Sequence, residues 1–411
     1  MTEHSFRDLR PIAVPAYGPT LLGSVGSGAI MPVIALTAAD LGGSVGTAAF
    51  VVALLGIGLV LADLPAGAIA ARFGEKTTLL LASALEFVGG LGALLAKNVA
   101  VLGASILLVG FSAAAFGLAR QSYLTAAVPV DLRARALSTL GGVYRIGMFL
   151  GPFVGALVIS HTGIQGAYLV DMVASVGAFL LVLFSRDITA DAPGDPARAV
   201  AAVPEKPEPV LRALFRHRRI LGTLGVGVLF LSVSRACRMA IVPLWAASIG
   251  LDAAHASLVF GIAGAADMLL FYPAGALMDR KGRLVVAFPS MIILGVGMIL
   301  VVFTSGFTSL LLVAMLLGFG NGIGAGLIMT LGADAAPAVG RPQFLAGWRL
   351  MSDAGNAAGP LLISGIALFA PLAAASIVIA VISFVGAEWL RHWIPRYDPV
   401  SAATLGRRRA D

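Results

Sequence analysis

The sequence predicts an all-α membrane protein in which twelve transmembrane helices form two pseudo-symmetric bundles of six. Three observations predict this fold class: an apolar composition, long apolar runs and an internal repeat. Of the 411 residues, 59% are hydrophobic and 12% are charged, with a mean hydropathy of +0.96, whereas soluble domains carry roughly 25% charged residues. A chain of this composition belongs in a lipid bilayer.

The apolar runs have the length that a helix needs to cross the roughly 30 Å hydrocarbon core at about 1.5 Å per residue. Because no run alternates with a period of two, helices are favoured over the strands of a closed barrel. The expected spans are residues 13–38, 47–71, 76–96, 99–128, 136–160, 166–185, 220–248, 255–278, 284–304, 308–333, 343–369 and 371–391.

The positions of lysine and arginine predict the orientation of these spans. Of the 28 basic residues, 22 fall in the segments on one side of the predicted membrane, and Lys97 stands alone on the other. The excess of basic residues in cytoplasmic segments therefore places both termini in the cytoplasm. The expected organisation is a cytoplasmic segment at 1–12, bundles at 13–185 and 220–391, a cytoplasmic linker at 186–219 and a cytoplasmic tail at 392–411.

The two bundles are predicted to be homologous, because several residues recur at a spacing of 208 positions. The recurring pairs are Pro65 and Pro273, Pro129 and Pro337, Arg133 and Arg341, Gly147 and Gly355, and the Gly-Pro pairs at 151–152 and 359–360. Six spans are an even number, so both halves enter the membrane in the same sense. The sequence thus predicts a parallel repeat about an axis along the membrane normal.

A short motif recurs between the second and third spans of each half. In the second half it reads GALMDRKGR and contains Gly275, Asp279, Arg280, Gly282 and Arg283. The first half reads GAIAARFGEK, which keeps Gly67, Arg72 and Gly74 but has Ala71 and Glu75 in place of an acid and a base. With the six-plus-six arrangement, the motif resembles that of the major facilitator superfamily of secondary transporters. The resemblance covers nearly the whole chain outside the tails and linker.

This resemblance implies that the charges of the motif bind across the two halves and hold the cytoplasmic side shut. The alternative is that they only anchor the cytoplasmic helix ends. We expect Gly67 and Gly275 to let neighbouring helices approach closely. We expect Gly74 and Gly282 to permit a tight chain reversal.

The fifth span carries a glycine motif formed by Gly147, Gly151, Pro152 and Gly155. It resembles the motif of the antiporter branches of the superfamily, although Ser138 and Ala156 replace two of its glycines. Close helix packing alone also explains small residues at every fourth position. The motif favours antiport.

Ionisable side chains inside predicted spans mark candidate transport sites, because lipid penalises each of them by at least ~2.5 kcal/mol. The acids are Asp63, Glu86, Asp171, Asp267 and Asp353, and the bases are Arg120, Arg145, Arg235, Arg238 and Arg349.

Residue counting and the family arrangement suggest three ion pairs, which are Arg145 with Asp267, Asp63 with Arg349, and Glu86 with Arg120. Each pair is either static or coupled to the binding of a proton by its carboxylate. We rank Asp63, Asp267 and Asp353 first as proton carriers. Arg235 and Arg238 either meet an anionic substrate or pair with Asp171, and Asn321 either donates to a cavity or lies in a stretch of close glycine packing.

The predicted function is secondary active transport by alternating access, most simply proton-coupled antiport that exports a small amphipathic organic compound. The alternative is a proton symporter that imports an anionic metabolite. The sequence lacks the phosphate-binding loop of an ATP-driven pump and the ligand spacing of a metal enzyme. We therefore expect a non-enzymatic monomer in a plasma membrane, with protons and a small molecule as partners, and without nucleic acid, metal or cofactor.

Overall fold

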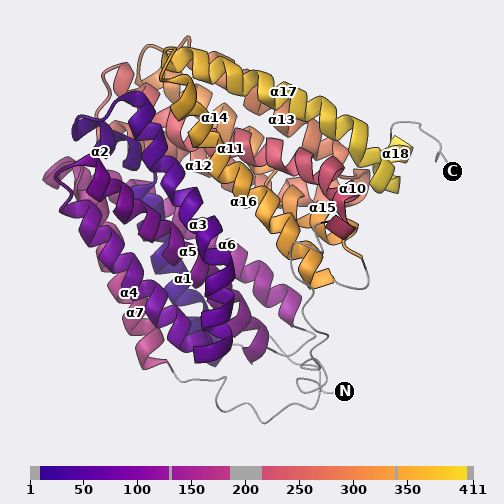
Figure 1. The fold of residues 1–411 in the computed structure, drawn as a ribbon, viewed down its shortest axis with the longest axis horizontal. Coiled ribbons are helices and arrows are strands. Elements are labelled where there is room, and N and C mark those ends of the chain that lie inside the picture. Colours follow the sequence, from indigo (N-terminus) through magenta and orange to yellow (C-terminus); the bar gives the residue numbers. More distant parts are fainter. Residues whose placement is uncertain (1–9, 129–131, 186–214, 338–340, 405–411) are drawn as a thin grey trace. The chain divides into compact units, whose positions relative to one another are not determined.

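The computed structural model describes residues 10–128, 132–185, 215–337 and 341–404, and these residues form helices joined by short turns (Figure 1). The chain divides into two compact units. One comprises residues 1–42 and 54–204, and the other comprises residues 43–53 and 205–411. Most of the predicted linker, 186–219, lies outside the described residues.

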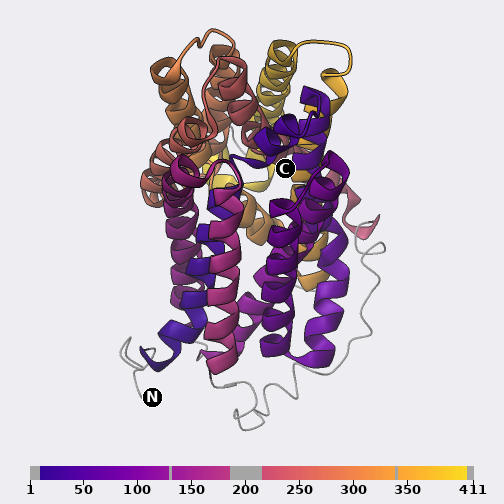
Figure 2. The ribbon, with the colours of Figure 1, turned by 90° about the vertical axis from the view of Figure 1, so that its left-hand side faces the viewer.

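The first unit contains long helices that lie side by side in both views (Figures 1 and 2). They are α1 (Arg10–Ile30), α2 (Ile34–Asp40), α3 (Val45–Phe73), α4 (Glu75–Leu94), α5 (Val99–Ala127), α6 (Arg133–Thr162) and α7 (Gly166–Phe184). The first residues of α3, up to position 53, belong to the second unit. The first predicted span is broken by a turn at 31–33, which separates α1 from α2.

The second unit repeats this architecture, and its helices are interrupted by a π-helical segment at 221–225 and by a turn at 324–326. Its helices are α10 (Arg218–Ile220), the π-helix η2 (Leu221–Gly225), α11 (Val226–Ser248), α12 (Ala253–Lys281), α13 (Leu284–Val301), α14 (Phe307–Ile323), α15 (Leu327–Ala335), α16 (Arg341–Ile366), α17 (Leu372–Tyr397) and α18 (Pro399–Thr404). A turn at 324–326 breaks the predicted tenth span, where Gly324 and Gly326 favour the interruption of the helix.

Eleven helical segments of the described chain are long and apolar enough to cross a membrane. The twelfth expected span, 343–369, corresponds to α16, which has 26 residues. This helix falls short in hydropathy because its middle carries Arg349, Ser352, Asp353 and Asn356. It is therefore polar along part of its length, as expected of a helix that is not wholly in contact with lipid.

The packing of helices repeats between the units as the 208-residue spacing predicts. In the first unit α1 packs against α6, α4 against α5, and α4 against α7. The matching contacts in the second unit are α11 with α16, α13 with α14, and α13 with α17. Large apolar side chains such as Val173, Leu269 and Phe303 remain 73 to 76% exposed. Such surfaces suit contact with lipid.

The glycines of the fifth-span motif lie where α6 touches α1. A Cβ atom at Gly151 would overlap the carbonyl oxygen of Val25, and one at Gly147 would overlap the Ser24 hydroxyl. The repeat partner of Gly151, Gly359, faces the carbonyl oxygen of Val233 on α11. The motif therefore forms a helix contact, which is the packing interpretation of its small residues.

The N-terminal cap of α12 gives a pH-dependent prediction. Asp252 Oδ1 accepts a hydrogen bond from the backbone N–H of His255 at 2.8 Å, and this bond holds the pKa of Asp252 below its ordinary value. The stabilisation is therefore complete above the ordinary carboxyl pKa and is lost as the pH falls through the lowered one. Asp252→Ala is expected to reduce the free energy of unfolding by ~1 kcal/mol at neutral pH, which is typical of a helix cap. The loss should be smaller in acid. Melting temperatures in detergent at both pH values check this, and equal losses would contradict it.

Candidate functional site

A partly buried polar network lies in the second unit, where α11, α12 and α14 meet. The Nε atom of Arg235 donates to Asn321 Oδ1 at 2.5 Å. The amide nitrogen of Asn321 donates in turn to Asp267 Oδ2 at 2.6 Å. Arg238 lies within electrostatic range of Asp267, and its guanidinium stands 5.4 Å from the ring centroid of Phe260. We call these four polar residues, Arg235, Arg238, Asp267 and Asn321, the C-terminal network.

Close backbone contact between α12 and α14 positions Asp267 and Asn321. A Cβ atom at Gly318 would overlap the carbonyl oxygen of Ala263, and one at Gly322 would lie 2.6 Å from the carbonyl oxygen of Asp267. The short Asn321 side chain can therefore reach Asp267 across the helix contact. The glycine-rich stretch around Asn321 packs closely, as one interpretation predicts, and the Asn321 amide donates to Asp267. Donation by Asn321 to a cavity stays a prediction.

The network carries a formal charge of +1, from two arginines and one carboxylate. Arg238 is 5% exposed and Asn321 is 4% exposed, so these groups have little contact with solvent. Charged side chains at such depth are rare in membrane helices and mark functional sites by default. The Asp267 carboxylate is joined to Arg235 through the Asn321 amide and has Arg238 within electrostatic range. Protonation of Asp267 or the arrival of an anionic group could rearrange these contacts.

The network joins residues of different expected spans. Counting residues at about 1.5 Å each places Asp267 nearer the cytoplasmic end of its span than Arg235 and Arg238 are to the end of theirs. The structure nevertheless joins Arg235 to Asp267 through Asn321. The predicted bridge from Asp267 to Arg145 would connect the two units, and it stays a prediction.

On α16 the structure pairs two of the predicted residues with each other. Arg349 Nε lies 3.3 Å from Asp353 Oδ2, one helical turn away. Arg349 was expected to meet Asp63 of the other half, and that bridge stays a prediction because the side chain of Asp63 lies outside the described residues.

In the first unit the structure describes one neighbour each for Glu86 and Arg120, and the predicted pair between these two residues stays a prediction. The Glu86 carboxyl lies beside the hydroxyl of Ser112 and within electrostatic range of Asp171 on α7. The Arg120 guanidinium stands 4.9 Å from the ring centroid of Tyr144. Asp171 thus has an acidic neighbour within its own unit, which the sequence analysis did not foresee.

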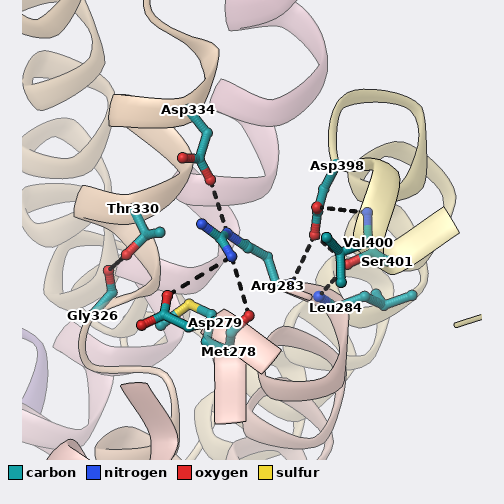
Figure 3. Close-up of polar contacts among 10 residues, drawn as sticks. All are labelled: Met278, Asp279, Arg283, Leu284, Gly326, Thr330, Asp334, Asp398, Val400 and Ser401. Atoms are coloured by element: carbon teal, nitrogen blue, oxygen red, sulfur yellow. Dashed lines mark hydrogen bonds and ion pairs between the residues drawn. The ribbon is translucent and has the colours of Figure 1, made fainter. Parts of the chain in front are cut away.

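The repeated loop motif makes its contacts differently in its two copies. In the second copy Arg283 Nε lies 2.8 Å from Asp334 Oδ2 at the end of α15, and a terminal nitrogen lies 3.9 Å from Asp279 Oδ1 (Figure 3). The backbone N–H of Arg283 also donates to Asp398 Oδ2 at 2.8 Å (Figure 3). These contacts all lie within the second unit, so the proposed bonds to the other half stay a prediction.

In the first copy Glu75 occupies the repeat position of Arg283, and its partner changes accordingly. The Ser122 hydroxyl of α5 donates to Glu75 Oε1 at 2.9 Å. Lys76 binds the carbonyl oxygen of Ser185 at the end of α7. The acid Glu75 thus stands where the second copy has the base Arg283. Its partner is accordingly a hydrogen-bond donor, Ser122, whereas the partner of Arg283 is an acceptor, Asp334.

The glycines of the motif divide into two groups. Gly74 and Gly282 have φ angles of +82° and +88°, which confirms the predicted chain reversal. In the described part of each unit, no atom lies within 4 Å of a Cβ position at Gly67 or Gly275, so the close helix approach predicted there is not seen. The charged residues Arg72 and Arg280 are exposed.

The C-terminal helix α18 is held against the loop by the same cluster. Ser401 donates to Asp398 Oδ2 at 2.5 Å and accepts from the backbone N–H of Leu284 at 3.0 Å (Figure 3). Replacing Asp398 by Ala is expected to release α18 and raise hydrogen exchange in residues 399–404. Each lost bond to a charged acceptor contributes about 1.5–3 kcal/mol. Asp279→Asn, whose side chain is 75% exposed, is the matched control. Equal exchange in both variants would contradict the prediction.

Sequence reasoning missed Asp334, Asp398 and Ser401 as partners of the loop. Asp334 lies three residues before the repeated Pro337, close to the predicted end of a span. That position could have suggested a partner for the basic loop. Asp398 and Ser401 carry no comparable signal, because their role depends on how the chain turns after α17.

Two repeated helix bundles with ion networks inside membrane-spanning helices define a membrane transporter rather than an enzyme. The chain belongs to the Major Facilitator Superfamily, whose family model matches residues 20–338 and 224–410.

Comparison with individual proteins agrees with this assignment. The chain is 26% identical over 280 residues to multidrug resistance protein MdtL of Escherichia coli O81 (strain ED1a), covering 67% of this chain and 69% of MdtL. The solved D-xylose-proton symporter matches with a TM-score of 0.73 at 15% identity, over 94% of this chain and 98% of the symporter. The nucleoside transporter NupG matches with a TM-score of 0.68 at 15% identity, over 93% and 98%. At this identity the structures show a shared fold only.

Proposed function

We propose that the protein is a proton-coupled antiporter that exports a small amphipathic organic compound across the plasma membrane by alternating access. The observation that carries the proposal is the C-terminal network, because charges of both signs within helices that are long and apolar enough to span a membrane suit a site that rearranges when a proton or substrate binds. The similarity to MdtL and the glycine motif of the fifth span favour export by antiport.

The network is not required by the repeated architecture. The positions 208 residues before Asp267 and Asn321 are Leu59 and Ala113. Equivalent helices in the first unit therefore pack without these polar groups. A polar cluster that the helix packing does not need is better explained by binding or coupling.

A second candidate is import of an anionic metabolite together with protons. The +1 charge of the network favours it, since Arg235 and Arg238 exceed the charge of Asp267. Asp63, Asp267 and Asp353 remain the candidate proton carriers from the sequence, under either function. The two functions differ in the direction of substrate movement relative to the proton gradient.

Purified protein in liposomes with an imposed pH gradient tests the proposal. Under antiport, an amphipathic dye moves opposite to the proton flow, and collapse of the gradient with an ionophore stops its accumulation. Under symport, an organic anion moves with the protons, and dyes do not move. Dye movement that persists without a gradient would contradict proton coupling, and empty liposomes control for passive leak.

A further inference from the structure

The strongest unassigned feature is a pair of buried acids inside the first unit. Glu86 of α4 and Asp171 of α7 lie within electrostatic range of each other. Asp171 is 1% exposed. Glu86 Oε1 and Asp171 Oδ2 are both shielded from solvent and have no hydrogen-bond partner among the described residues. We call these two residues the acid pair.

The helices α1 and α4 pack closely around the Asp171 carboxyl group and leave little room for a ligand. A Cβ atom at Gly26 of α1 would lie 2.5 Å from Asp171 Oδ1, and one at Gly90 of α4 would lie 3.0 Å from Asp171 Oδ2. The carboxyl group is therefore enclosed by the glycine backbones of two helices. A hydrated ion or an organic group does not fit there, whereas a proton on a carboxyl oxygen does.

The hydrogen bonding of Ser112 also favours a proton as the ligand of the acid pair. Its hydroxyl donates to the carbonyl oxygen of Ala82 at 2.7 Å. A serine hydroxyl has one proton, so its remaining capacity toward the neighbouring Glu86 is as an acceptor. A carboxylate cannot donate to it, but a protonated carboxyl can.

The fold does not require acids at these two positions. The residues 208 positions after Glu86 and Asp171 are Leu294 and Ile379. Both are fully buried, on α13 and α17, which pack against each other as α4 and α7 do. Apolar side chains therefore serve the same helix contact in the second unit. Retaining two acids in the first unit, each with one buried oxygen that has no hydrogen-bond partner among the described residues, costs free energy that packing does not explain.

The helices around the acid pair carry other titratable groups. Those described on α1, α4, α5, α6 and α7 are Tyr17, Glu75, Lys76, Arg120, Tyr123, Tyr144, Arg145, His161 and Tyr168. Tyr168 is electrostatically linked to Asp171 and donates its hydroxyl to Thr37. Arg120 lies eight residues, about 12 Å, along α5 from Ser112 and contacts the Tyr144 ring.

We propose that Glu86 and Asp171 share one exchangeable proton and form the proton-binding site of the first unit. This inference rests on the proposed proton-coupled function and adds a proton-binding site in the first unit to the candidate carriers Asp63, Asp267 and Asp353. Two like charges side by side in a membrane interior are strongly unfavourable, so the pair holds a proton in the enclosed state. Water reaches Asp171 only when α1, α4 and α7 move apart. Proton release is thereby tied to a conformational change, as coupling requires.

The proposal is tested first without any substrate, by infrared spectroscopy of the purified protein in lipid while the pH is varied. The wild type is expected to show a carbonyl stretch of a protonated carboxyl that shifts in heavy water and titrates as one proton. Glu86→Gln and Asp171→Asn should each alter that band, and the double variant should abolish it. Asp279→Asn, an exposed acid, should leave it unchanged. Absence of the band in the wild type, or its persistence in the double variant, would overturn the proposal.

Transport separates this inference from the proposed function. The acid-pair variants should lose accumulation driven by a pH gradient by about tenfold or more, while exchange of substrate for substrate continues. Driven accumulation at the wild-type rate in the double variant would overturn the inference and leave proton coupling intact. If the wild type moves no compound against a proton gradient, the proposed function fails, and the spectra still decide whether the pair binds a proton. Should Asp171→Asn not fold, Glu86→Gln carries the same two measurements.

Discussion

Asp267→Asn is expected to reduce transport by at least about tenfold, in gradient-driven and exchange modes alike. The carboxylate is the negative group of the C-terminal network, and it holds Asn321 at 2.6 Å with Arg238 nearby. Its loss leaves Arg238, which is 5% exposed, without that countercharge. Removing one partner of a fully buried ion pair costs about 3–5 kcal/mol, and the half-buried position of Asp267 makes the expected cost smaller. Both the melting temperature and the transport rate should therefore fall.

A double variant separates the loss of stability from the loss of function. Adding Arg238→Gln to Asp267→Asn returns the formal charge of the network to +1, as in the wild type, and should restore part of the melting temperature, since the two groups are coupled. Transport should stay low, because the network no longer orders Arg235 and Asn321. Exchange that survives in Asp267→Asn while driven transport is lost would contradict this expectation. It would identify Asp267 as the proton carrier that the sequence suggested.

Gly151→Ala is expected to destabilise the first unit by about 1–3 kcal/mol, the usual cost of overpacking. The added methyl group would overlap the carbonyl oxygen of Val25 and lie 2.7 Å from the Cα atom of Gly28. Backbone atoms cannot move aside as a flexible side chain can, so α1 and α6 must separate. Thermal stability in detergent, followed by size-exclusion chromatography, measures the effect.

The same helix provides a matched control for this prediction. Gly142→Ala lies on α6, and no described atom comes within 4 Å of its Cβ position. It should leave the melting temperature unchanged or raise it slightly, because alanine favours the helical state over glycine. Equal melting temperatures for the two variants would show that the motif does not act through helix packing. A transport defect confined to Gly151→Ala would follow from the altered α1–α6 contact.

The membrane class, the long helices and the two-fold repeat could be predicted from the sequence. Each of these depends on properties that neighbouring residues share, such as a run of apolar side chains or a constant spacing of 208 positions. The chain reversals at Gly74 and Gly282 were also predictable from local sequence. A tight reversal needs a positive φ angle, which glycine adopts readily. The helix breaks after Ile30 and Ile323 were missed, since an apolar run continues across each of them.

The partners of the buried charges could not be predicted in the same way. Asp267 accepts a hydrogen bond from Asn321, which in turn accepts one from Arg235, and neither contact was predicted from the sequence. Its pairing with Arg145 stays a prediction. Glu86 lies within electrostatic range of Asp171, which is 85 residues away in the chain. Which side chains meet depends on the rotation of each helix about its axis and on its position along its neighbour.

Local composition and spacing therefore establish that the chain crosses a membrane as two related bundles of helices. The choice of partners inside those bundles belongs to the tertiary structure, through close glycine contacts such as those at Gly26, Gly90 and Gly322. A shift of one helical residue turns a side chain by about 100° and moves it about 1.5 Å along the axis. Such a shift leaves the hydropathy of the helix unchanged but changes which side chains meet. The charged residues can therefore be located in the sequence, whereas their partners depend on the tertiary structure.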